Sequence, residues 1–146
     1  MADAFSRALG YLTARSRTVQ ETNRYLQGKG YPPEEVQGAV TRLLELDLLN
    51  DEKTARQWVE YNSRCKYKGR ERLLRELRAR GVDPETAEKA LEPLDDEEEL
   101  RMALELLAPR RAEEWPLGKL YRFLRYRGFS YCTWERVKLY YENLTE

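Results

Sequence analysis

Histidine is absent from this chain of 146 residues, and only two cysteines are present. Without an imidazole the chain has no Ser-His-Asp or Cys-His pair and no histidine ligand for a metal. Cys65 and Cys132 are far apart and belong to no C-x-x-C pair, so we expect reduced, partly buried thiols rather than metal or redox chemistry. The carboxylates fall at expected helix starts and on polar faces, where capping and solubility explain them. The composition therefore favours a protein that is not an enzyme and that uses no cofactor or metal.

Long apolar runs and an excess charge of one sign are lacking as well. The sequence has no run of about eighteen apolar residues, and its first residues do not form a basic segment followed by an apolar one. We therefore expect a cytoplasmic protein with no membrane partner. The 26 basic residues balance the 26 acidic ones. The overall charge thus indicates no partner, and only the local distribution of charge is informative.

What the chain does contain is one helix-corner-helix pattern, used three times. Each copy has a leucine, a glycine four residues later, an apolar residue directly after the glycine, a helix-starting residue, and another apolar residue six places after the glycine. The corner glycines are Gly30, Gly81 and Gly128. Glycine adopts the left-handed conformation that ends a helix at little steric cost. The spacing between successive corner glycines is longer than a regular helical repeat of about 34 residues, and it fits stacked three-helix units.

Apolar residues at helical spacing and capping residues such as Thr18, Asn50 and Asp83 predict nine helices. We group them into three-helix repeats over residues 1–49, 50–94 and 95–146. Because no unit is large enough to fold alone, neighbours are expected to share apolar faces, giving an all-α, elongated and curved array. The acidic run from Asp95 to Glu99 begins a helix, and we interpret it as dipole-stabilising and solvated rather than as a site for a basic partner.

Basic residues concentrate on the expected middle helices of the second and third units. From Arg64 to Arg80, eight basic residues stand against Glu71 and Glu76 alone, and the matching segment of the third unit has four basic residues and no acid. If the units stack in similar orientation, these side chains form one basic stripe that meets phosphates or an acidic protein surface. The alternative is that they only solvate outer helix faces. The candidate partner-binding residues are Arg64, Lys66, Lys68, Arg70, Arg72, Arg75, Arg78, Lys119, Arg122, Arg125 and Arg127.

Two further patterns are compatible with nucleic-acid binding. Tyrosines can stack on single-stranded bases, but we interpret most of them as packing residues and expect exposure for Tyr67 and Tyr126, which basic residues flank. The other tyrosines considered are Tyr61, Tyr121, Tyr131, Tyr140 and Tyr141. A three-helix unit with a tight corner also suggests a helix-turn-helix DNA reader. The helix after each of the first two corners is acidic, however, which disfavours direct base reading.

Four segments carry a resemblance in their order and spacing. They are Ala8 to Arg15 with Arg17 and Thr18, Leu49 to Asp51 with Ala55 to Val59, Gly69 to Leu77 with Arg80 to Val82, and Phe123 to Ser130. Together they resemble the RecX family, the bacterial regulators of the RecA recombinase. Two positions depart from the family pattern, because Asn50 stands where aspartate is common and Thr54 stands where an aromatic residue is usual.

The resemblance implies a tandem three-helix repeat protein that binds the RecA nucleoprotein filament on single-stranded DNA. It also implies non-catalytic inhibition of the ATPase, strand-exchange and SOS-related activities of RecA. We expect a monomer with weak direct contact to DNA at most. Two alternatives stay open: a non-specific module that binds single-stranded or duplex DNA, and a helical scaffold for another protein. Zero net charge and the acidic third helices argue against the first alternative.

Overall fold

The structure of the protein, a computed structural model, describes residues 2–144. Within this range it consists of nine α-helices and two short 3-10 helices, with no strand. The α-helices are α1 (Ala4–Ala14), α2 (Val19–Gly28), α3 (Pro33–Glu45), α4 (Asp51–Arg64), α5 (Arg70–Ala79), α6 (Pro84–Leu91), α7 (Asp96–Leu107), α8 (Leu117–Tyr126) and α9 (Tyr131–Leu144). The 3-10 helices, η1 (Ala108–Arg110) and η2 (Ala112–Glu114), lie between α7 and α8.

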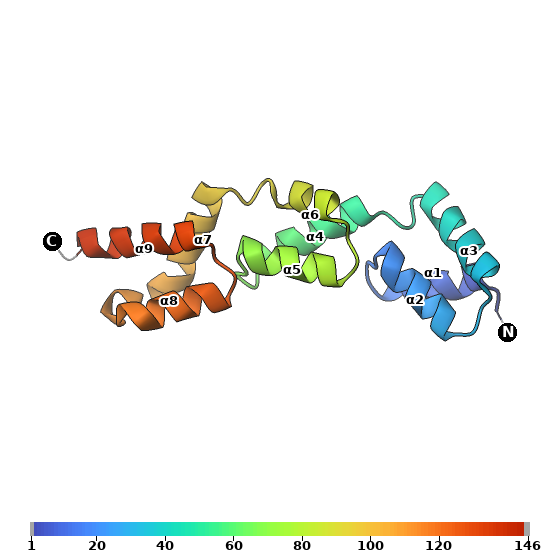
Figure 1. Ribbon diagram of the computed structural model, residues 1–146, viewed down its shortest axis with the longest axis horizontal. Helices are drawn as coiled ribbons and strands as arrows, with labels where there is room; N and C mark the ends of the chain where they lie inside the picture. The colour runs from blue at the N-terminus through green and yellow to red at the C-terminus, as the bar shows by residue number, and fades with distance from the viewer. Residues whose placement is uncertain (1, 145–146) are drawn as a thin grey trace.

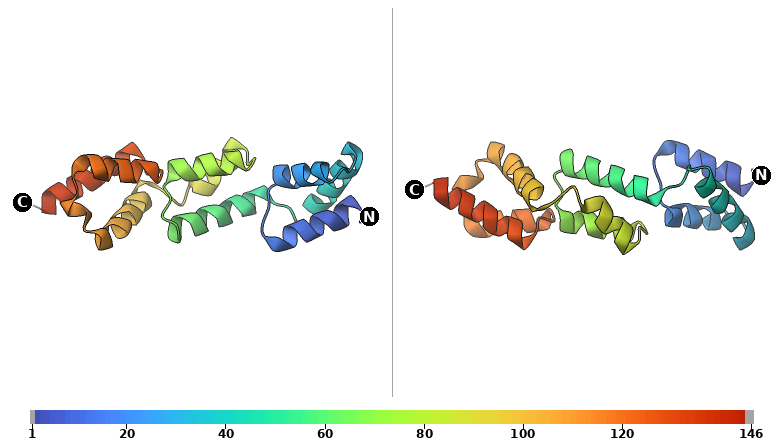
Figure 2. Two further views of the ribbon diagram at one scale, coloured as in Figure 1. Left: turned by 90° about the horizontal axis from the view of Figure 1, so that it is seen from below. Right: turned by 90° about the horizontal axis from the view of Figure 1, so that it is seen from above.

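The helices follow one another in groups of three along one long axis (Figure 1). The group α1–α3 lies at one end, α4–α6 in the middle and α7–α9 at the other end, and the chain termini lie near opposite ends. Two further views, from below and from above the view of Figure 1, show the same order (Figure 2). The prediction of an elongated, all-α array of three-helix units is therefore confirmed.

All three corners have the predicted conformation. The φ angles of Gly30, Gly81 and Gly128 are 91°, 93° and 93°. After each glycine, the next backbone N–H returns to a leucine carbonyl in the last helical turn, as in a Schellman motif. These bonds join Tyr31 to Leu26 at 3.4 Å, Val82 to Leu77 at 3.0 Å and Phe129 to Leu124 at 3.0 Å. All six of these side chains are buried, so each corner also pins two apolar residues into the core.

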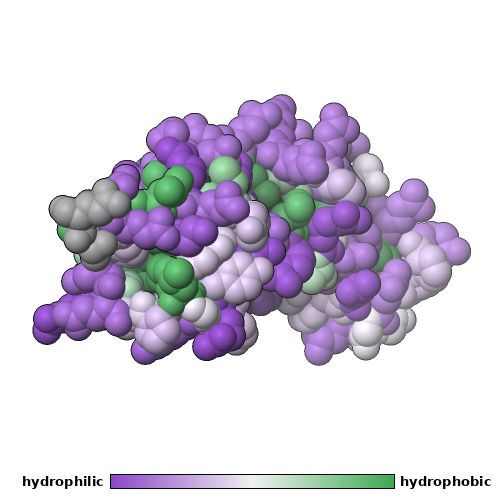
Figure 3. Space-filling view, turned by 60° about the vertical axis from the view of Figure 1, so that its left-hand side comes forward, coloured by the Kyte–Doolittle hydropathy of each residue, from purple (hydrophilic) through white to green (hydrophobic). Residues whose placement is uncertain are grey.

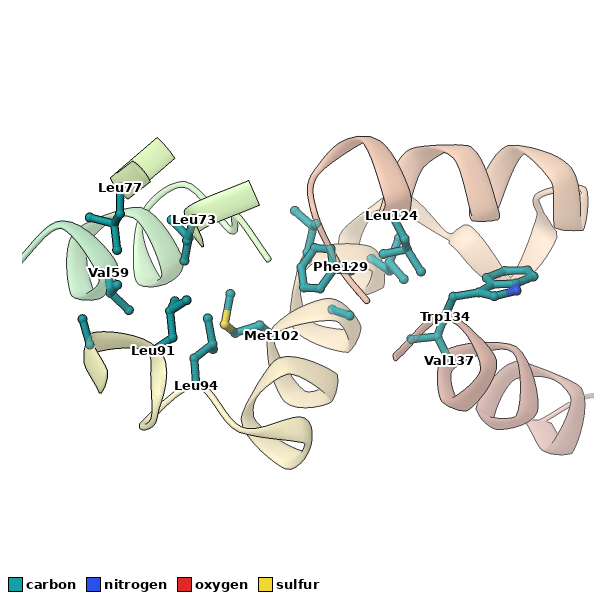
Figure 4. Packing of buried hydrophobic residues seen from close by; sticks show 14 of the residues in the cluster. Val59, Leu73, Leu77, Leu91, Leu94, Met102, Leu124, Phe129, Trp134 and Val137 are labelled. Atoms are coloured by element: carbon teal, nitrogen blue, oxygen red, sulfur yellow. The ribbon is translucent and has the colours of Figure 1, made fainter. Parts of the chain in front are cut away.

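Among the described residues, the buried apolar side chains form two clusters rather than three. One belongs to α1–α3 and includes Leu26 and Leu43. The other runs without a break through α4–α9. Figure 4 shows Met102 of α7 beside Leu94, near the junction of the second and third groups. The repeat boundaries at residues 49/50 and 94/95 stay a prediction, since the second one falls inside this continuous cluster.

The middle helices α2, α5 and α8 are joined end to end. The hydroxyl of Thr18, the N-cap of α2, donates to the carbonyl of Arg80, the C-cap of α5, over 2.7 Å. In the same way, the N–H of Gly69, the N-cap of α5, donates to the carbonyl of Arg127, the C-cap of α8, over 2.9 Å. The amino end of one helix thus meets the carboxyl end of the next, an arrangement in which helix dipoles attract.

Acidic residues at the starts of α4 and α7 complete these joints. The Asp51 carboxylate accepts the N–H of Val19, the first residue of α2, over 2.9 Å. The Glu99 carboxylate accepts the N–H of Arg70, the first residue of α5, over 2.8 Å. Glu99 is fully buried, so the expectation that the run from Asp95 to Glu99 is solvated is wrong at that position. Because Glu99 lies between two units, its carboxylate is shielded from water. Hydrogen-bond donors of the protein take the place of water molecules.

Candidate partner-binding surface

Glu76 of α5 holds two of the predicted basic residues. The Lys68 ammonium lies 3.0 Å from one Glu76 oxygen, and the Arg72 Nε lies 3.2 Å from the same oxygen. The indole N–H of Trp58 donates to the other oxygen over 3.1 Å. Only 17% of the Lys68 side chain is exposed. These contacts join α4 to α5. Lys68 therefore mainly stabilises the fold, and part of the charge of Arg72 is neutralised by Glu76.

Two more predicted residues tie the second unit to the third. Arg70 pairs with Asp96 and places its Nε 3.5 Å from the buried Glu99 carboxylate. Arg125 donates to Glu71 over 2.6 Å and to the carbonyl of Phe129 over 2.8 Å. About two thirds of each arginine side chain is buried. Both guanidinium groups therefore neutralise acids at the joint, and they project less charge to solvent than the sequence suggested.

The arginines that cap α5 and α8 stack on aromatic rings. Arg80 lies 4.5 Å from the centroid of the Trp58 ring and pairs with Glu21 at 2.9 Å. Burial raises the pKa of Glu21, but the hydrogen bonds from Arg80 and Thr18 outweigh it and leave that pKa below its usual value. Arg127 lies 5.0 Å from the centroid of the Phe123 ring and donates to the carbonyl of Lys66 over 3.2 Å. Burial and the nearby cations Arg110 and Arg72 lower the Arg127 pKa.

Four of the predicted residues on α5 and α8 present their charge to solvent. Arg75, Arg78, Lys119 and Arg122 are exposed, and within residues 2–144 none of their side chains forms an ion pair. Lys119 rests 4.3 Å from the centroid of the Trp115 ring, which leaves its charge available. All four lie on α5 or α8, two of the helices joined end to end. These four residues are the free part of the predicted stripe on α5 and α8; Lys66, after the end of α4, is also exposed and forms no ion pair among residues 2–144.

A shallow groove of ≈ 500 Å³ crosses the α5–α8 joint. Its lining residues are Arg72, Arg75, Glu76, Ala79, Arg125 and Tyr126. The structure thus brings together basic residues that are about fifty positions apart in the sequence. The two other predicted residues lie at the end of α4. Arg64 makes a solvent-exposed pair with Glu60, and Lys66 lies 6.0 Å from the centroid of the Tyr61 ring.

The solvent exposure of the tyrosines differs from the prediction. Tyr126 is 80% exposed, as predicted, and the Arg72 guanidinium lies 5.9 Å from the centroid of its ring. Tyr67 is partly buried, and its hydroxyl donates to Glu105 over 2.6 Å, a bond that raises the Tyr67 pKa. The expectation of exposure is therefore wrong for Tyr67. Tyr61, Tyr121, Tyr131 and Tyr140 are partly exposed as well, although Tyr121 and Tyr140 pack edge to face against Trp134 and Tyr141.

Metal ligands, the cysteines and the apolar length of the helices are the other features of the described residues that bear on function. Among residues 2–144, no group of three or more His, Cys, Asp or Glu side chains is placed to hold a metal. Cys65 and Cys132 are free and exposed, so the expectation of partial burial is wrong. Over the same part of the chain, no helix is long and apolar enough to cross a membrane. The predicted stripe is therefore represented at the surface by the free basic residues and the groove beside them.

Comparison with known proteins gives a consistent result. The sequence profile of the RecX first three-helix domain matches residues 4–43, and that of the RecX second three-helix domain matches residues 50–91. Regulatory protein RecX of Prosthecochloris aestuarii is 34% identical over 129 residues, which cover 87% of this chain and 85% of that one. RecX of Bacillus subtilis is 34% identical over 100 residues, which cover 68% of this chain but 38% of that protein. RecX of Mycolicibacterium smegmatis is 37% identical over 106 residues, 73% of this chain and 56% of that protein. The chain therefore spans less than two thirds of these last two relatives.

Solved structures show the same architecture. A crystal structure of RecX from Lactobacillus salivarius superposes with a TM-score of 0.86 at 25% identity, covering 95% of this chain and 94% of that one. A second crystal structure, of a regulatory protein RecX, superposes with a TM-score of 0.81 at 26% identity, covering 92% and 70% of the two chains. The chain belongs to the RecX family of regulatory proteins.

Proposed function

We propose that this protein binds the RecA filament on single-stranded DNA and inhibits its ATPase, strand-exchange and SOS-related activities. It performs no chemistry itself. Membership of the RecX family supports this proposal, and the four free basic residues on α5 and α8 are the structural observation that carries it. A RecA partner implies a cytoplasmic protein that acts in DNA repair and recombination. We take the dilute chain to be a monomer.

The mechanism follows from the shape of the molecule. A rod of three units can contact several neighbouring subunits of a filament at once. Simultaneous contacts raise the overall affinity without requiring any single strong one. The free basic residues Arg75, Arg78, Lys119 and Arg122 then meet acidic protein surface or filament DNA along the same line. An inhibitor that bridges subunits in this way opposes the rearrangements that filament extension and ATP turnover require.

One observation favours a second candidate function, non-specific DNA binding. Tyr126 is 80% exposed beside a basic groove, and exposed rings next to cations are typical of surfaces that bind single strands. Against this function, Lys68, Arg70, Arg72 and Arg125 are partly neutralised by acids. The balanced charge of the chain also gives little long-range attraction to DNA.

The test is the rate of ATP hydrolysis by the RecA protein of the same organism on single-stranded DNA, measured with increasing amounts of this protein. We expect inhibition at or below stoichiometric ratios. An unchanged rate at such ratios would contradict the proposal. In parallel, binding to naked DNA is measured as a function of salt. Tight binding with a steep salt dependence, without inhibition, would support the second candidate instead.

A further inference from the structure

The joint between the first and second units and the joint between the second and third units are the same kind of contact, formed by two different surfaces. One side is the start of a middle helix, and the other is the corner at the end of the next middle helix. At the first joint a Cβ added to Gly81 would overlap the side chain of Gln20, near the start of α2. At the second joint a Cβ added to Gly128 would overlap Arg72, near the start of α5. Each internal corner is thus covered by the helix start of its neighbour.

The corner of the first unit has the same shape, but none of the described residues covers its glycine. Gly30 has the same positive φ as the other two corner glycines, yet a Cβ placed on it would meet no atom within 4 Å. Lys29 is the C-cap of α2 and corresponds to Arg80 and Arg127, which both bridge a joint. Lys29 is exposed, and its side chain forms no ion pair within the described part of the chain. The first unit therefore carries an unused corner.

The start of α8 is the matching unused side. Its N-cap, Pro116, makes no side-chain capping bond, and a Cβ on Gly118 would meet only the Arg122 side chain. Leu117 and Tyr121 are 51% and 38% exposed. By contrast, the starts of α2 and α5 are covered by the next unit.

The end of the rod at α8 and α9 is also apolar. Besides Leu117 and Tyr121, Leu139, Tyr140 and Leu144 of α9 are exposed. Figure 3, which turns this end toward the viewer, shows hydrophobic patches between the polar side chains. In repeat proteins, an apolar face of this kind is normally covered by a neighbouring unit. This end of the protein has the character of an internal repeat.

We propose that the corner of the first unit of one copy docks on the start of α8 of another copy. Gly30 of the first copy then takes the place that Gly81 and Gly128 occupy at the internal joints. Lys29 lies next to the exposed carboxylates of Glu113 and Glu114, which precede α8. The two sides lie at opposite ends of the long axis (Figure 1). The contact is therefore head to tail, and it extends into an open row of copies.

This copy-to-copy joint is weaker than the internal ones. The carboxylates of Asp51 and Glu99 bond the starts of α2 and α5, whereas Ala4 and Arg7 stand at the corresponding positions of α1. Glu114 must also share its charge with Arg111, which lies 2.8 Å away. The chain is therefore monomeric when dilute and associates when concentrated. Copies bound next to one another on any long template are favoured for the same reason, since their local concentration is high.

The test is sedimentation of the full chain over a wide range of protein concentration, without DNA or any other protein. We expect the average mass to rise with concentration. Two charge variants, Lys29→Glu and the double variant Glu113→Lys/Glu114→Lys, each place like charges across the proposed contact and are expected to stay monomeric. An equimolar mixture of the two variants restores opposite charges and is expected to associate again.

A steric variant checks the same contact independently of charge. Gly118→Trp adds bulk to the uncovered start of α8 and is expected to abolish association, whereas Gly10→Trp, also on an open helix face, is expected to leave it unchanged. The proposal is overturned if the wild-type chain remains monomeric at every concentration. It is equally overturned if association survives Gly118→Trp and both charge variants. Neither outcome bears on the inhibition of RecA, which is measured separately.

Discussion

Gly69 and Gly128 lie in direct backbone contact, although 59 positions separate them in the sequence. A Cβ added to Gly69 would overlap the carbonyl group of Gly128 and the nitrogen of Phe129. Two backbone bonds cross the same point, from Gly69 to the Arg127 carbonyl at 2.9 Å and from Glu71 to the Gly128 carbonyl at 3.1 Å. The second and third units are thus locked together through main chain that leaves no room for a side chain.

The first prediction concerns Gly69→Ala. The φ angle of Gly69 is −79°, which alanine adopts freely, so any loss of stability comes from the crowded joint. We expect the free energy of unfolding to fall by about 1–3 kcal/mol, the usual cost of overpacking a rigid contact. Urea unfolding followed by circular dichroism measures it. The matched control is Gly38→Ala in the exposed middle of α3, where a Cβ meets nothing within 4 Å and where alanine is expected to add about 0.5–1 kcal/mol. Equal effects of the two changes would contradict the role of the joint.

The second prediction concerns Glu99→Gln. The buried carboxylate accepts bonds from the backbone N–H groups of Arg70 and Ser130 and from the hydroxyls of Ser130 and Thr133. An amide of the same size presents N–H donors to some of these donors and leaves Arg70 without its buried counter-charge. We expect a loss of about 2–4 kcal/mol in the free energy of unfolding.

The neighbouring variant Glu98→Gln is the control for Glu99→Gln. Glu98 pairs with Arg101 at the surface, and such pairs contribute less than about 1 kcal/mol. Both variants are compared by urea unfolding at neutral pH. If Glu98→Gln costs as much as Glu99→Gln, the buried carboxylate does not have the structural role that its contacts indicate.

The third prediction is a pH dependence at Asp51. Burial raises the pKa of this carboxyl above its ordinary 3.8; the N–H of Val19 opposes the shift, and the charges of Asp83 and Glu21 add to it. Because the Asp51 pKa is higher in the folded state than in the unfolded state, protonation of Asp51 stabilises the fold. This stabilisation is complete below the unfolded-state pKa and is lost as the pH rises through the folded-state pKa. Asp51→Asn keeps an acceptor for Val19 without the charge. We therefore expect the variant to match the wild type in acid and to be more stable at neutral pH.

Thermal unfolding of both proteins between acid and neutral pH measures this difference. Asp83→Asn serves as the comparison, because the hydrogen bonds from Thr86 lower the Asp83 pKa. The pH dependence expected for Asp83 has the opposite sign. The charged Asp83 carboxylate stabilises the fold above the unfolded-state pKa, and this contribution is lost as the pH falls through the folded-state pKa. A stability difference for Asp51→Asn that is constant with pH would show that the charge of Asp51 has no cost.

The corners and caps could be predicted from the sequence because they are local. Gly30, Gly81 and Gly128 mark helix ends through a conformation that glycine alone adopts cheaply. The capping box at Thr18 and Glu21 and the caps at Asn50 and Asp83 likewise involve residues only three positions apart. Each of these signals depends on neighbours along the chain, so the helices and the repeat follow without knowledge of the packing.

The candidate surface could be predicted only in part, because it depends on which residues meet across the joints. The sequence places Arg125 in a segment without acids, yet the end-to-end contact of α5 with α8 brings Glu71 to it. Lys68 forms an ion pair with Glu76, and most of its side chain is buried. Glu99 could not be distinguished from four adjacent acids, since only its position on α7 turns it toward α5 and α9.

The last prediction tests the free part of the basic stripe. Arg75 and Arg78 are exposed on α5 and form no ion pair among the described residues, so the double variant Arg75→Glu/Arg78→Glu is expected to keep its melting temperature. If these side chains meet an acidic partner or filament DNA, reversing both charges turns attraction into repulsion. We expect the concentration needed for half-inhibition of the RecA ATPase to rise by about tenfold or more, equivalent to about 1.4 kcal/mol. The control Arg56→Glu/Lys89→Glu makes the same charge change on exposed residues of α4 and α6 and is expected to leave inhibition unchanged. Full inhibition by the Arg75/Arg78 variant, or equal losses in both variants, would show that the partner does not bind through this face of α5.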